Sequence, residues 1–77
     1  MNRRRRKELE KALLLLGEAR DIIESVRDDE QDAYDNMPES FQYSDRGEAM
    51  SEYIDTIEDA LSSIDDFSES LSDIAFG

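Results

Sequence analysis

Two residue types that carry much of protein chemistry are absent from this 77-residue sequence, which contains no cysteine and no histidine. Without cysteine the chain forms no disulfide and offers no thiolate ligand for zinc. Without histidine it lacks the commonest general base and the commonest metal ligand. It also has no Gly-rich phosphate loop and no Glu-x-x-His pair of the kind that binds iron in helical bundles. These absences predict a protein that is not an enzyme and has no cofactor and no structural metal.

Long apolar runs are missing as well. The longest, Ala12–Leu16, is five residues, whereas a helix needs about 20 to cross a bilayer. Glu8, Glu10 and Lys11 interrupt the approach to this run, so the basic start of the chain is not expected to act as a secretion signal. The sequence therefore predicts a soluble, cytoplasmic protein that does not enter membranes.

The short length limits how much surface folding can bury. We expect a single domain, 1–77, and a core of this size rarely supplies more than about 3–5 kcal/mol. Disulfides and metals, which usually support such small folds, are excluded by the composition. Self-association into a dimer or a higher homo-oligomer is therefore the expected source of further burial.

Charge is distributed unevenly along the chain. Twenty-one acidic residues face nine basic ones, a net charge of −12, and five of the nine bases lie in the run Arg3–Lys7. The remaining body is strongly acidic and repels nucleic acids and anionic membranes. Direct binding of DNA or RNA is therefore not expected.

Apolar spacing predicts two long helices, about 4–35 and about 45–75, joined by a connection at 36–44. Asp45 or Ser44 is expected to cap the second helix. Two helices of similar length with one connection predict an all-α fold, an antiparallel two-helix hairpin. The apolar seam expected in the first helix is Leu9, Ala12, Leu16, Ala19, Ile23, Val26, Ala33 and Met37, and in the second Tyr53, Ile57, Ala60, Ile64, Phe67, Leu71 and Ile74.

The apolar surface of the first helix is wider than one partner helix can cover. Four consecutive leucines, Leu13–Leu16, point about 100° apart and so cover most of the circumference. We therefore expect hairpins to associate into a helical bundle. The expected oligomer core is Leu9, Leu13, Leu16, Ile23, Val26, Ile57, Leu61 and Ile64.

The connection carries apolar weight that a plain linker would not need. Pro38 ends the first helix and favours a short turn of helix after it. Phe41 and Tyr43 then either fold back as an apolar plug on the end of the bundle or form an exposed contact surface together with Arg46. Gly47 allows another group to approach the backbone closely. Arg46 opposes the helix dipole, so we expect it either to contact an anion or a partner, or to pair with Asp28, Asp29, Glu30 or Asp32.

Two charged features offer further alternatives. The basic run is neutralised across the hairpin by Asp65, Asp66, Glu69 and Asp73, touches nucleic acid, or forms an anion pocket where subunits meet, because arginine forks bind phosphates in a bidentate manner. The acidic stripe of the second helix is either a solvated face or a surface that binds a basic groove. The candidate partner-binding residues on this stripe are Glu48, Glu52, Asp55 and Asp59.

The segment EQDAYDNMPESFQYSDRGEAM, Glu30–Met50, followed by YIDTIEDALSSIDD, resembles short acidic helical proteins of phages and prophages of Gram-positive bacteria. These share a pattern close to E-x-x-D-N-x-P-E-x-x-Q-x-S-D/E-R-G-E. The resemblance covers nearly the whole chain and implies a phage-encoded accessory protein in the cytoplasm of an infected host. Proteins of that origin often regulate or disable host machinery.

Three functional hypotheses follow, all of them non-enzymatic. In the first, the protein binds a host protein, such as a defence factor, through its acidic face and connection. In the second, an oligomer sequesters a nucleotide immune signal in a pocket lined by Arg3, Arg4, Arg5, Arg6 and Arg46. In the third, the bundle is purely structural and serves in assembly.

Overall fold

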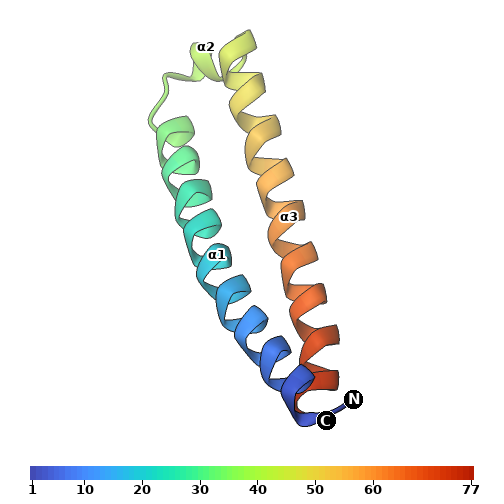
Figure 1. Cartoon of the computed structure of the whole chain (residues 1–77). Helices are drawn as coiled ribbons and strands as arrows, with labels where there is room; N and C mark the ends of the chain where they lie inside the picture. The colour runs from blue at the N-terminus through green and yellow to red at the C-terminus, as the bar shows by residue number, and fades with distance from the viewer.

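Three helices and no strands make up the computed structural model, which describes all 77 residues. They are α1 (Arg3–Asp35), α2 (Glu39–Gln42) and α3 (Asp45–Ala75). The predicted all-α class is confirmed. Figure 1 shows α1 and α3 side by side in opposite directions, with α2 at the end farthest from the two termini. The molecule is extended, 58 × 15 × 14 Å, and no helix combines the length and apolar character of a membrane span.

Side-chain oxygens start the two long helices. The Asn2 side chain accepts a hydrogen bond of 2.9 Å from the backbone N–H of Arg5 at the start of α1. Ser44 caps α3 by accepting from the N–H of Gly47 at 3.3 Å. Of the two expected caps, Ser44 is therefore the one used. Asp45 lies in the first turn, where its negative charge interacts favourably with the helix dipole.

Two arginines of α1 show the register between the long helices. Arg20 forms a fork with Asp65, with Nε 2.5 Å from Oδ1 and Nη2 3.2 Å from Oδ2, and its Nη1 lies 2.6 Å from Glu24 Oε2. Seven residues later, Arg27 Nη1 lies 3.9 Å from Glu58 Oε1. Because Glu58 is seven residues before Asp65, equal steps forward on α1 and backward on α3 stay opposite each other. This is the register of an antiparallel pair.

The same register keeps the run Arg3–Lys7, the basic tip, away from the acids expected to neutralise it. Arg6 precedes Arg20 by fourteen residues, whereas Asp73 follows Asp65 by only eight. At 1.5 Å per residue, Arg6 therefore lies about 9 Å beyond the level of Asp73. No residue of the basic tip forms an ion pair. Neutralisation across the hairpin, one of the three alternatives for this run, is therefore not found.

The observed seam between α1 and α3 shares every second residue with the predicted seam. At the alternate places it uses the next residue along the chain. Where Ala19 and Val26 were expected, Arg20 and Arg27 face α3 and are half-buried. Their aliphatic stems cover the seam while their guanidinium groups reach the acids of α3. On α3 the seam likewise uses Ile54 and Leu61, which are buried, instead of Tyr53 and Ala60, which are exposed. Only four apolar residues are buried in the whole chain: Met50, Ile54, Leu61 and Ala75.

This rotation gives the hairpin two unlike long sides. The closed side carries the ion pairs of Arg20 and Arg27. The residues that immediately precede Arg20 and Arg27, or Ile54 and Leu61, flank the seam on the opposite side. In an antiparallel helix pair, equivalent flanking positions of the two helices face each other, so these residues lie together. We call this opposite side, with the adjacent Leu15 and Ile22, the open face. It consists of Ala12, Leu15, Ala19, Ile22, Val26 and Ala33 of α1 and Tyr53, Ala60, Phe67 and Ile74 of α3.

Candidate binding surfaces

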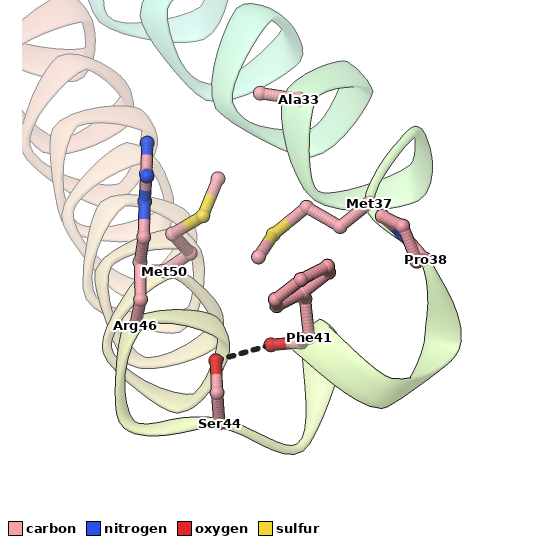
Figure 2. A pocket seen from close by; sticks show the side chains of 7 residues that line it. All are labelled: Ala33, Met37, Pro38, Phe41, Ser44, Arg46 and Met50. Carbon is pink, nitrogen blue, oxygen red and sulfur yellow. Dashed lines mark hydrogen bonds between the residues drawn. The ribbon is translucent and has the colours of Figure 1, made fainter.

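Polar side chains hold the connection against the ends of the long helices. Gln42 Nε2 donates to the backbone oxygens of Tyr34 at 3.0 Å and Met37 at 3.4 Å, and so ties α2 to the end of α1. The Ser44 hydroxyl donates to the carbonyl oxygen of Phe41, the contact drawn in Figure 2. Pro38 caps α2 and is not its first residue. The fixed glutamine of the pattern that carries the resemblance falls on Gln42, but nothing in the sequence assigned it a role, because an amide in a connection has many possible partners.

Gly47 allows α2 to pack against the first turn of α3. It is buried, and a Cβ atom at this position would overlap the backbone carbonyl oxygens of Gln42 and Phe41. The close approach expected at Gly47 is therefore made by the chain's own backbone. This contact fixes the geometry of the whole loop end.

A cavity of about 450 Å³ opens at the loop end, between the end of α1 and the start of α3. In Figure 2 the side chains of Met37 and Phe41 point towards α3, where Met50 and Arg46 form the other wall. The lining is Ala33, Met37, Pro38, Phe41, Ser44, Arg46 and Met50. Because Ala33 belongs to the open face, this cavity is a continuation of that face at the loop end. It is mainly apolar, with one cation.

Arg46 has no ion pair, so the salt bridge expected to the acids at the end of α1 is absent. Phe41 lines the cavity but stays 58% exposed, and Tyr43, at 76% exposed, lines nothing. The plug on the bundle end is therefore incomplete within one chain. Aromatic and cationic groups remain available for contact there.

The acidic stripe of α3 is free of partners in the chain. Its four candidate residues are exposed and form no ion pair. Steps of four, three and four residues place Glu48, Glu52, Asp55 and Asp59 along one line of the helix. No group of three or more carboxylates lies close enough together to hold a metal ion. The stripe is thus a line of negative charge available to a basic surface.

The arginines proposed to share an anion pocket are far apart. Arg3, Arg4, Arg5 and Arg6 lie at the terminal end of the rod and Arg46 at the loop end. In a molecule 58 Å long, no anion contacts both groups within one chain. A pocket of this kind requires ends from different copies.

Most of the expected oligomer core is used within the chain. Leu61 is buried at 5% exposure, and Leu9, Leu13, Leu16, Ile23, Ile57 and Ile64 are half-buried along the seam. Val26, at 51%, is the one exposed member. Most of the large apolar side chains left exposed on the two long helices lie on the open face and are Leu15, Ile22, Val26, Tyr53, Phe67 and Ile74; Leu14, 73% exposed, lies outside this face. The spacing of the sequence did not separate these two stripes because both are apolar.

The fork on the closed side changes the acidity of its members. The hydrogen bond from Arg20 lowers the pKa of Asp65 below its ordinary value, and the charge of Arg20 acts in the same direction. In return, hydrogen bonds to Asp65 and then Glu24 raise the pKa of Arg20. The fork is therefore an electrostatic clasp between α1 and α3.

Comparison with known proteins gives no match to any family model, curated protein or solved structure. The surfaces described above are accordingly the basis for inferring what the protein does. They are an apolar open face that extends into a cavity, an unpaired acidic stripe, and an unpaired basic tip.

Proposed function

We propose that this chain is a non-enzymatic binding protein whose working form is a bundle of two hairpins packed through their open faces. The observation that carries the proposal is the contrast between burial and exposure. Four apolar residues are buried, whereas six large apolar side chains are exposed along the open face. Several large apolar side chains exposed along one face are typical of an interaction site in soluble proteins.

The driving force for this association is apolar burial. Fully burying a large apolar side chain contributes about 1.5–3 kcal/mol, and the six from each copy meet in one interface. Small residues, Ala12, Ala19 and Ala33 on α1 and Ala60 on α3, alternate with the large ones and allow close helix approach. A second copy thus supplies the burial that one hairpin lacks.

The acidic stripe indicates which class of protein the dimer binds. Glu52 and Asp59 lie on the outer surface of α3, turned away from the seam, so they stay exposed when open faces meet. A line of carboxylates along a rigid helix suits a basic protein surface and accelerates association with it. The proposal is therefore an antagonist or regulator that binds a basic protein. Its assignment to a host protein during phage infection rests on the resemblance of Glu30–Met50 alone.

Sedimentation velocity and circular dichroism over a wide concentration range test the association. We expect a dimer at high concentration that dissociates on dilution, with a partial loss of helical signal. Phe67→Glu places a charge in the open face and should keep the chain monomeric at concentrations where the wild type is dimeric. Ser62→Glu adds the same charge on an exposed position outside the open face and should leave association unchanged. A compact, fully helical wild-type monomer at all concentrations would contradict the proposal.

Charge reversal tests the binding of a basic protein by the acidic stripe. A variant with Asp55 and Asp59 changed to Lys should remain dimeric and helical but lose capture of basic proteins from a host lysate. Wild-type capture should also weaken steeply as salt rises, because salt screens exposed charges. Equal capture by both proteins would exclude the acidic stripe as the binding surface.

A further inference from the structure

We infer that the two hairpins of the bundle pack with their loop ends at opposite ends of the assembly, so that the basic tip of each copy lies against the acidic loop end of the other. This inference rests on the proposed function, because it specifies how the two open faces meet. The occupant of each open face is a second copy of this chain.

The first argument is the charge difference between the two ends of the rod. Residues 28–52 form the loop end and include a single base, Arg46. Residues 1–11 and 65–77 form the terminal end and hold six bases against six acids, so this end has no net charge. The nine acids of the loop end are Asp28, Asp29, Glu30, Asp32, Asp35, Glu39, Asp45, Glu48 and Glu52.

Packing in the same direction would put two loop ends, each with a net charge of −8, side by side. Packing in opposite directions puts each of them beside an end without net charge whose tip is strongly basic. Charges that face each other across an interface lie within the screening length of about 8–10 Å at physiological salt. Salt therefore does not remove the energy difference between the two packing directions. Like charges placed together disfavour an arrangement strongly. Charge complementarity therefore selects the opposed dimer.

The second argument is that both charged ends lack partners in their own chain. The four salt bridges of the structure involve only Arg20 and Arg27 among the cations. The basic tip lies about 9 Å beyond the last acid of α3 that could have paired with it. At the other end, the acids that follow Asp28 on α1 form no ion pair, and Arg46 is the single cation there. Opposed packing brings these two unpaired sets together.

The third argument concerns the cavity at the loop end. It is open within one chain, and its walls are mainly apolar. In the opposed dimer, the terminal end of the second copy lies over it. At that end the open face carries Ile74, 45% exposed, and the seam carries Leu9, half-buried. A second copy in this orientation thus covers the one cavity of the hairpin with apolar side chains.

Spin labels separate the two orientations, and the absence of native cysteine makes single labelling straightforward. A label at Ser40→Cys lies on exposed α2 at the loop end. In the opposed dimer the two labels are separated by most of the 58 Å length of the rod. In a same-direction dimer they are less than about 35 Å apart, because two packed helices each measure about 10–12 Å across.

Ser25→Cys is the matched control, since it is exposed near the middle of α1 and points outwards. It gives a short distance in either orientation and so reports the dimer itself. Pulsed dipolar spectroscopy on both variants should give a long distance at Ser40 and a short one at Ser25. Short distances at both positions overturn the orientation but leave the proposed dimer intact. No intermolecular distance at either position overturns the proposed dimer, and the orientation with it.

A charge change tests the contact of the tips. Replacing Arg3, Arg4, Arg5 and Arg6 by Gln should weaken dimerisation at least about tenfold at low salt, with a much smaller effect at high salt. Replacing Lys11 by Gln removes one charge outside the basic tip and should have little effect. An unchanged dimerisation constant for the fourfold variant at low salt would show that the basic tip contacts nothing in the assembly, and would overturn the inference.

Discussion

The two long sides of the hairpin are built on the same pair of helices but complete their burial differently. On the closed side, Arg20 and Arg27 extend across the seam, cover it with their stems and pair with Asp65 and Glu58. On the open face, the corresponding positions on α1 hold Ala19 and Val26, which are too short to cover the exposed Phe67. Long charged side chains can therefore close a seam within one chain, whereas small apolar ones leave it for a second chain.

The largest expected effect comes from truncating one side chain of the seam and one of the open face. Leu61→Ala opens a cavity in the seam at a residue only 5% exposed. We expect it to lower the free energy of unfolding by about 2–5 kcal/mol at every protein concentration. Phe67→Ala, at a residue 61% exposed, should lower stability only at concentrations where the wild type is dimeric. Urea denaturation over a concentration series measures both.

The opposite pattern would break the comparison. If Phe67→Ala destabilised the diluted chain as much as Leu61→Ala, the open face would be part of the hairpin's own core. If neither variant showed a concentration dependence, the exposed apolar side chains would have no role in association.

The fold class was predictable from the sequence, but the facing of the helices was not. Apolar spacing and the Pro38 break are local signals, and they identified helical segments. Which stripe faces inwards depends on competition between neighbours one position apart. Arg20 and Arg27 occupy the seam because each buries a long stem and finds an acid opposite, a gain that a periodicity of apolar residues does not register.

The candidate site was predictable only where local chemistry suffices. The exposure of Glu52 and Asp59 follows from their position opposite the apolar stripe, and the close approach at Gly47 follows from the absence of a side chain. The cavity was not foreseen, because it depends on how Met37, Phe41 and Met50 meet across the chain. An excess of apolar surface on the first helix was expected, but the open face itself was not, because the predicted seam contained all of its residues except Leu15 and Ile22.

Two glycines outside the open face provide the next test. Gly47→Ala inserts a methyl group against the carbonyl oxygens of α2, so we expect a loss of about 1–3 kcal/mol as the loop end is forced apart. A methyl group at Gly17 would meet no neighbouring atom within 4 Å, so Gly17→Ala should stabilise the chain by about 1 kcal/mol through helix propensity. Thermal and urea unfolding of the two variants gives both values.

Gly17→Ala also tests which long side of the hairpin packs against a second copy. Because Gly17 flanks the seam on the closed side, its methyl group should not alter the sedimentation of the dimer. Weaker association of this variant would mean that a second copy packs on the closed side, and the open face would then not be the interface. Stabilisation by Gly47→Ala would contradict the packing of α2 on α3.

The smallest expected effect concerns the fork between Arg20 and Asp65 on the closed side, the electrostatic clasp between α1 and α3. The folded chain lowers the pKa of Asp65 below its ordinary 3.8 through the hydrogen bond from Arg20. Asp65 therefore binds its proton more weakly in the folded chain than in the unfolded one. Its contribution to stability is complete above about pH 4 and is lost as the pH falls through the lowered pKa. Arg20→Gln should return the pKa of Asp65 towards its ordinary value and remove this part of the acid destabilisation.

Carbon-detected NMR titration of the Asp65 carboxyl, with melting temperatures recorded from about pH 5 down to about pH 2, measures this effect. Arg46→Gln is the matched control, because it removes an equal charge from an arginine without an ion pair. The control should keep the low pKa of Asp65 and the wild-type dependence of melting on pH below about 4. If both variants moved the titration of Asp65 equally, the clasp would be a general effect of net charge. The closed side would then be held by apolar packing of the arginine stems alone, and the two sides of the hairpin would differ in shape rather than in electrostatics.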